Sequence, residues 1–110
     1  MKGFVYILTN KAYPGLVKVG KTDKNPKERA KELFTTAVPH PFKVFGYVEF
    51  ENAEKAERIT HEKLDKYRES ANREFFKVGP QVALDEICNI NEGILLKKAI
   101  IAREELVKVE

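Results

Sequence analysis

The chain has 110 residues, of which 43% are hydrophobic and 34% charged, and its net charge is +3. This length suits one domain with a modest core, and the apolar share excludes a disordered chain. A single cysteine excludes an intramolecular disulfide, and the N-terminal apolar run is too short for a signal peptide or a membrane span. We therefore expect a cytoplasmic protein with no membrane partner.

The charge is unevenly distributed along the chain. Residues 1–50 contain nine Lys and Arg against four Asp and Glu, whereas residues 51–110 contain eleven against thirteen. A basic half is what binding to a phosphate polymer requires. From charge alone, a solvated lysine-rich surface is an equally good interpretation.

The N-terminal part of the sequence predicts a β-hairpin followed by a helix. Residues 4–8 are β-branched and aromatic, and residues 16–20 alternate apolar and polar side chains after a turn that contains Pro and Gly. Gly20 is expected to allow a close approach to the backbone. Asn25 is the predicted cap of a helix that begins at the following proline and ends near residue 34.

The middle of the sequence predicts a third strand and a second helix. Residues 42–50 form a long apolar run, and Asn52 is the expected cap of a helix with an apolar stripe over residues 53–67. Glu57 and His61 lie one turn apart on the neighbouring stripe, so we expect them to share a face.

The C-terminal part predicts a short extended piece at residues 74–78 and then a helical extension over residues 80–110. The apolar residues of this extension recur at roughly helical spacing. Two alternatives stay open: one continuous helix, or two helices separated at residues 89–93. The order of elements predicts an α/β (α+β) fold with a three-stranded sheet flanked by helices. The hairpin must be antiparallel, and the direction of the third strand is open. The domain itself is expected to end at residue 79.

With these elements placed, the chain resembles the GIY-YIG nuclease superfamily, and within it the small stand-alone bacterial and phage branch. The resemblance covers about residues 3–78. It is carried by Phe4-Val5-Tyr6, Lys18-Val19-Gly20 with Lys21-Thr22, Arg29, Glu57, and Asn72 followed by Arg73-Glu74-Phe75-Phe76. Lys18 stands where the wider superfamily has a second tyrosine, although lysine is usual in this branch. The first motif lacks its glycine and isoleucine.

The resemblance implies a mostly antiparallel sheet and Mg²⁺-dependent hydrolysis of DNA, with Mn²⁺ as a substitute metal. Glu57 would hold the metal, because Mg²⁺ prefers hard oxygen ligands. Arg29 would neutralise charge on the phosphoryl group. Tyr6 would activate or orient the attacking water, and a cation, for which Lys18 is the candidate, would lower its pKa.

Further site residues follow from the same resemblance and from their positions. His61 is expected to contact the active site as a proton shuttle, a phosphate contact or a partner that orients Glu57. Asn72 would position that carboxylate or the substrate. Three residues after the hairpin are expected to bind DNA phosphates: Lys21, Thr22 and Lys24.

Three functional classes remain open at this point. The first is a DNA endonuclease, the second a non-catalytic DNA-binding module with the same fold, and the third an interaction protein that works through its helical tail. The sequence shows no base-reading helix, so specificity would come from a partner protein or from a second copy. The C-terminal helical extension is expected either to pack back on the domain or to form the contact of a homodimer.

Overall fold

The computed structural model describes residues 2–69, 74–90 and 96–101, the last segment by its backbone only. These residues form one antiparallel sheet of five strands in the order β4-β2-β1-β3-β5. The strands are β1 (Gly3–Thr9), β2 (Val17–Thr22), β3 (Lys43–Phe50), β4 (Phe75–Phe76) and β5 (Leu96–Ile101). The helices are α1 (Pro26–Leu33), α2 (Ala53–Lys63) and α3 (Pro80–Cys88), with a short 3₁₀ turn over Asp65–Tyr67. The predicted α+β class is confirmed, with more strands than expected.

The predicted helix starts are confirmed by their caps. The Asn25 side chain accepts a hydrogen bond from the Lys27 N–H at 2.7 Å at the start of α1, and Asn52 accepts one from the Lys55 N–H at 3.0 Å at the start of α2. These bonds satisfy N–H groups that have no partner within the helix. The two caps therefore determine where the helices that carry the candidate site residues begin.

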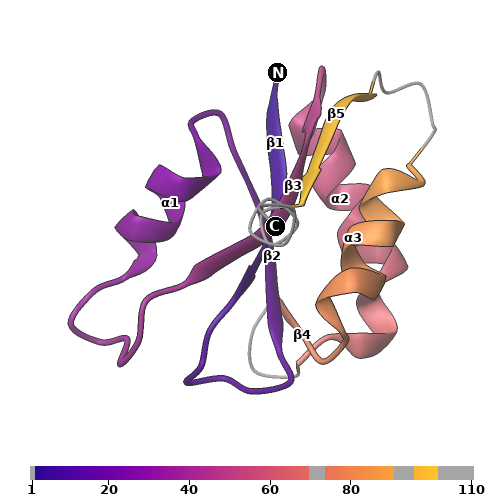
Figure 1. Ribbon diagram of the computed structural model, residues 1–110. Helices are drawn as coiled ribbons and strands as arrows, with labels where there is room; N and C mark the ends of the chain where they lie inside the picture. The colour runs from indigo at the N-terminus through magenta and orange to yellow at the C-terminus, as the bar shows by residue number, and fades with distance from the viewer. Residues whose placement is uncertain (1, 70–73, 91–95, 102–110) are drawn as a thin grey trace, which may run out of the picture.

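The third strand is antiparallel to β1 and lies on the side opposite β2, so β1 is central to the sheet (Figure 1). Helix α1 covers one face of the sheet, and helices α2 and α3 cover the other. The larger core lies beneath α2 and α3. The smaller one, beneath α1, contains Tyr6, Leu8 and Ala30.

The helical prediction for the C-terminal part is right for α3 and wrong for residues 96–101. Residues 96–101 form β5, which pairs with β3 from Gly46↔Ile101 to Phe50↔Leu96. Pairing with the outer edge of β3 satisfies its backbone groups, and this outweighed the helical spacing of the apolar residues. Residues 91–95 and 102–110 lie outside the described residues.

Helix α3 packs within the domain. Its apolar residues Ala83, Leu84 and Ile87 are fully buried in the larger core. The apolar face of α3 is thus buried against the same chain. The domain boundary at residue 79 and a homodimer through this helix stay predictions. None of the helices in the described ranges has the length and apolarity needed to cross a lipid bilayer.

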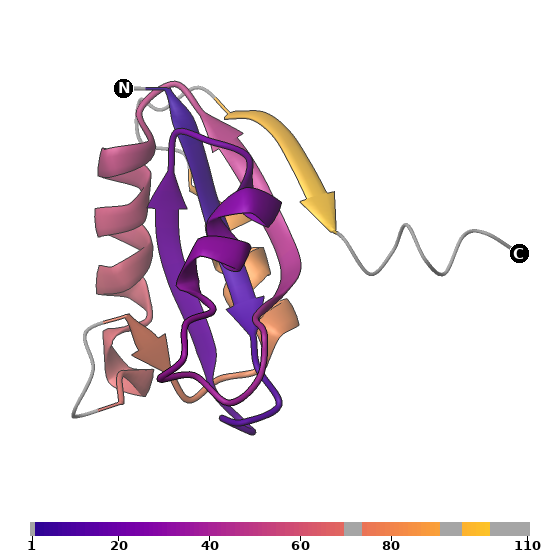
Figure 2. The ribbon, with the colours of Figure 1, turned by 90° about the vertical axis from the view of Figure 1, so that its left-hand side faces the viewer.

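The candidate site lies along the face of β2 that carries Lys18, Gly20 and Thr22, and along the outer edge of this strand. Helix α1 packs over β3 and β1, and Figure 2 shows β2 running beside α1, with α2 beyond it. Strand β4 pairs with β2 at Val17 and Lys18, the start of that strand. Next to this pairing, the Val19 carbonyl at the outer edge of β2 faces His61 of α2.

Candidate functional site

The centre of the site is the contact between Tyr6 and Gly20. These residues are directly opposite in the β1–β2 ladder, and a Cβ added at Gly20 would lie 2.6 Å from the Tyr6 hydroxyl oxygen and 2.8 Å from Cζ. The ring therefore lies flat over the glycine, and only 1% of the tyrosine is exposed. The predicted close approach at Gly20 is confirmed, and the approaching group is the Tyr6 side chain.

Arg29 reaches this phenol from α1. Its guanidinium donates a hydrogen bond to the Tyr6 hydroxyl and a second bond, of 3.2 Å, to the Glu32 carboxylate. Burial raises the pKa of Tyr6 above its ordinary value, and the lowering effect of Arg29 does not offset it. The expectation of a lowered pKa with Lys18 as the responsible cation is therefore wrong, because desolvation is the larger effect and the adjacent cation is Arg29.

Lys18 lies on the same face of the hairpin as Tyr6 but has a different partner. It is opposite Leu8, two residues from Tyr6, so the side chains of Tyr6 and Lys18 share a face. Its ammonium forms a 2.7 Å ion pair with Glu74 and lies 5.4 Å from the centre of the Phe75 ring. Lys18 is thus held against β4.

Glu74 is a site residue that sequence reasoning missed. Besides binding Lys18, it accepts a hydrogen bond on its backbone oxygen from the Val19 N–H at 3.0 Å, and its charge raises the pKa of both Tyr6 and Glu57. It stands within the Arg73-Glu74-Phe75-Phe76 block that carried the family resemblance. That block was the sequence signal that could have identified Glu74 as a site residue.

His61 attaches α2 to the edge of β2. Its Nε2 lies 2.9 Å from the Val19 carbonyl oxygen, and its ring packs 5.3 Å from the Phe76 ring. A carbonyl only accepts, so Nε2 carries a hydrogen and donates. In the neutral imidazole this leaves Nδ1 as the nitrogen with a free lone pair.

Glu57 lies one turn before His61 on α2, the helix that covers the opposite face of the sheet from α1, and its charge still reaches the phenol of Tyr6. Its charge raises the pKa of Tyr6, and its own pKa is raised by burial and lowered by the charges of His61, Lys21 and Lys18. Within the described part of the chain, its carboxylate makes no hydrogen bond or ion pair. A half-buried carboxylate with no direct partner among the described residues has its oxygens available to a positive ligand.

The donor set bears on which metal could be held. Among residues 2–69 and 74–90, no three His, Cys, Asp or Glu side chains cluster in a way that would enclose a metal ion. A single carboxylate fits Mg²⁺, which keeps most of its waters and is commonly held by one or two carboxylates and substrate phosphate. It does not fit a structural zinc site, which takes four protein ligands.

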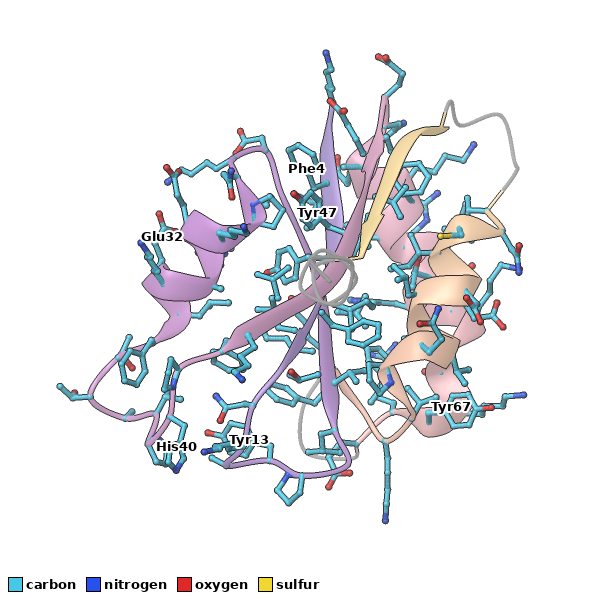
Figure 3. The ribbon with its side chains drawn as sticks, viewed as in Figure 1. Phe4, Tyr13, Glu32, His40, Tyr47 and Tyr67 are labelled. Atoms are coloured by element: carbon cyan, nitrogen blue, oxygen red, sulfur yellow. The ribbon has the colours of Figure 1, made fainter. Side chains whose placement is uncertain are left out.

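The predicted phosphate-binding residues lie together with Arg29. Lys21, Thr22 and Lys24 line a cavity of about 460 Å³ with the guanidinium, beside the start of α2. Glu32, labelled on α1 in Figure 3, is the shared ion-pair partner of Lys24, at 3.0 Å, and of Arg29. We call this cavity the basic pocket. Asn72, the remaining predicted site residue, lies outside the described residues.

The fold and site define a small α+β domain with a charged site that combines basic and acidic side chains. The chain belongs to the T5orf172 domain family, whose model matches residues 3–91. This is a phage-associated, DNA-related domain, related to homing-endonuclease-like folds. The family match includes α3, beyond the predicted end of the domain at residue 79.

A trigger factor of Caldicellulosiruptor saccharolyticus is similar to part of the chain. The two are 31% identical over 82 residues, which is 74% of this chain and 19% of the trigger factor. The chain thus spans about a fifth of the length of this relative. No solved structure matches the chain with significance.

Proposed function

We propose that the chain is a Mg²⁺-dependent endonuclease that hydrolyses phosphodiester bonds of DNA through a GIY-YIG-type site. Family membership supports a DNA-related role. The observation that carries the proposal is the approach of Arg29 to the Tyr6 phenol over Gly20, with the charge of Glu57 near enough to raise the pKa of that phenol. His61 is bonded to Val19, the neighbour of Gly20 in β2, one turn from Glu57.

Arg29 binds the phosphoryl group in this proposal. It is 40% exposed and lines the basic pocket, so its outer N–H groups are available to a ligand while others bind Tyr6 and Glu32. A planar guanidinium with two fixed protein partners presents its remaining donors in one direction. It would therefore stabilise charge that develops on the phosphoryl oxygens without reorganising.

Glu57 is the proposed metal ligand. When bound, Mg²⁺ supplies Lewis-acid polarisation of the phosphoryl oxygen and stabilises the leaving oxygen. The carboxylate is suited to hold it, because it is half-buried and has no direct partner among the described residues. Asn72 as its positioning residue remains part of the proposal.

In this proposal His61 accepts a proton from the attacking water, and Tyr6 orients that water. The bond from Nε2 to Val19 leaves Nδ1 of His61 as an acceptor for a proton from water, one turn from Glu57. Tyr6 stays a neutral phenol at physiological pH, because burial raises its pKa. It would therefore orient Arg29 and the water by hydrogen bonding and would not act as the base.

A non-catalytic DNA-binding module is the second candidate. Two observations favour it: Tyr6 is almost fully buried, and Lys18 is neutralised by Glu74. Under this alternative, the basic pocket would still bind phosphates, because Lys21, Lys24 and Arg29 line it. Binding without cleavage would distinguish the two functions.

The test is nicking of supercoiled plasmid DNA with Mg²⁺, with Mn²⁺ and with a chelator. We expect metal-dependent nicking that Glu57→Gln reduces by at least about 100-fold, the scale for loss of a group that stabilises the transition state. Glu62→Gln is the matched control, because Glu62 is an exposed acid on the same helix. Salt-sensitive DNA binding with no nicking in either metal would favour the binding module, and no DNA binding at all would refute both.

A further inference from the structure

A second hollow lies at the Lys18 end of β2. It has a volume of about 410 Å³ and is mostly apolar, and Lys18 and Glu69 are its charged members. Its aromatic members are Tyr13, Phe42 and Phe75. We call it the aromatic hollow.

The three aromatic rings form one cluster assembled from distant segments. Tyr13, at the hairpin end of the sheet in Figure 3, meets Phe75 edge-on with ring centres 5.6 Å apart. Phe42 lies 6.4 Å from Tyr13 and 6.5 Å from Phe75. All three side chains are only partly buried. The cluster therefore presents aromatic surface to the hollow instead of closing it.

The aromatic hollow and the basic pocket lie on either side of Tyr6 and Gly20. Lys18 lines the hollow and Thr22 lines the basic pocket, and these residues are two positions before and two positions after Gly20 on the same face of β2. Two residues of a strand span roughly 7 Å. A nucleic-acid strand that followed β2 would thus meet cations on one side of the proposed cleavage point and aromatic rings on the other.

We propose that the aromatic hollow takes an unpaired DNA base next to the cleaved phosphate. This rests on the proposed function and names its substrate class, DNA with at least one base outside the duplex at the cut. Bases stack on aromatic side chains whatever their identity, because each has a π-face. Lys18, whose ammonium is paired with Glu74 at 2.7 Å, lies at the edge of the hollow, 5.4 Å from the centre of the Phe75 ring.

The first measurement uses the wild-type protein and a metal chelator, so that no DNA is cut. Fluorescent oligonucleotides report affinity for single-stranded, flapped and fully paired DNA of one sequence, and 2-aminopurine placed next to the junction reports stacking. We expect tighter binding to the flapped and single-stranded forms and quenching of 2-aminopurine. Equal affinity for all three forms, or unchanged fluorescence on binding, would overturn the inference without requiring any variant.

The second measurement removes the rings. We expect Tyr13→Leu and Phe42→Leu each to weaken binding of flapped DNA by roughly 5- to 150-fold, the range for loss of one base–aromatic stack, with little effect on paired DNA. Phe34→Leu is the control, because this aromatic is 45% exposed and lies outside the hollow. Folding is checked by thermal unfolding, and an equal loss in the control would overturn the inference.

Parallel nicking assays separate this inference from the proposed function. Cleavage of DNA by a protein that shows no 2-aminopurine quenching would refute the aromatic hollow and leave the nuclease intact. Quenching without cleavage in Mg²⁺ or Mn²⁺ would refute the nuclease and leave a base-binding module.

Discussion

Replacing Gly20 by alanine should displace Tyr6 and so impair both folding and activity. The backbone at Gly20 does not have a positive φ, since Gly15 is the residue with that conformation in the described chain, so alanine meets no conformational penalty there. The effect comes from contact alone. The added methyl group would lie 2.6, 2.8 and 3.1 Å from three atoms of the Tyr6 side chain, whereas ordinary contact begins near 3.4 Å.

The ring must therefore retreat by roughly 0.8 Å at its hydroxyl, toward a core that already holds Leu8 and Ala30. Overpacking of this kind costs about 1–3 kcal/mol of unfolding free energy. A displacement near 1 Å in a catalytic arrangement costs on the order of 100-fold in rate. We expect both losses in Gly20→Ala, because the Tyr6 hydroxyl is also the hydrogen-bond partner that orients Arg29.

The assay combines chemical denaturation with initial rates of plasmid nicking. Gly79→Ala is the matched control, because the nearest atom to its added Cβ is Val82 Cγ2 at 4.0 Å. The control should keep the wild-type rate and lose roughly 0.5–1 kcal/mol, because alanine is a poorer helix cap than glycine. A Gly20→Ala protein with wild-type stability and rate would refute the reasoning about Tyr6.

Three further predictions concern single groups. Arg29→Lys should lower the nicking rate roughly 100-fold, because lysine lacks the planar fork of the guanidinium. The rate is measured at a DNA concentration that saturates both proteins, and an unchanged rate would contradict the role of the guanidinium. Tyr6 holds its proton more tightly in the folded than in the unfolded chain, so its contribution to stability is present below its ordinary pKa of 10.0 and is lost as pH rises above it. Denaturation of wild type and Tyr6→Phe should therefore show the wild type losing unfolding free energy relative to the variant above pH 10.0, and parallel curves would refute the raised pKa. Leu84→Ala, at a fully buried position in α3, should cost about 2–5 kcal/mol by denaturation, and a loss under about 0.5 kcal/mol would show that α3 is separable from the domain.

Much of the fold was predictable because the local signals agree with the tertiary structure. Alternation and β-branching located β1, β2 and β3, and the asparagine caps located the starts of α1 and α2. The local pattern failed at residues 96–101. Their apolar spacing was helical, but the outer edge of β3 offered backbone partners that no local pattern reveals.

The candidate site was predictable in part. The hairpin register places Tyr6 and Lys18 on one face, and the turn of α2 brings Glu57 beside His61. The pairing of charges was not predictable, because it depends on which long side chains meet across elements. Arg29, not Lys18, reaches the phenol.

Two further features depend on β4. The position of this strand is fixed by its pairing with β2 in the folded chain. Glu74 neutralises Lys18 across the β2–β4 contact, and Phe75 joins Tyr13 and Phe42 in the aromatic hollow. These residues are separated by about thirty or more positions along the chain. Their proximity has no signature in local spacing.

The most direct test of the proposed active site is a crystal structure of the protein soaked in Mn²⁺, analysed by anomalous scattering. We expect one peak bonded to a Glu57 carboxylate oxygen, on the side that faces Tyr6 and Arg29, and no peak at that position in Glu57→Gln. A well-ordered Glu57 without a peak, or the same peak in the variant, would contradict the proposed metal site.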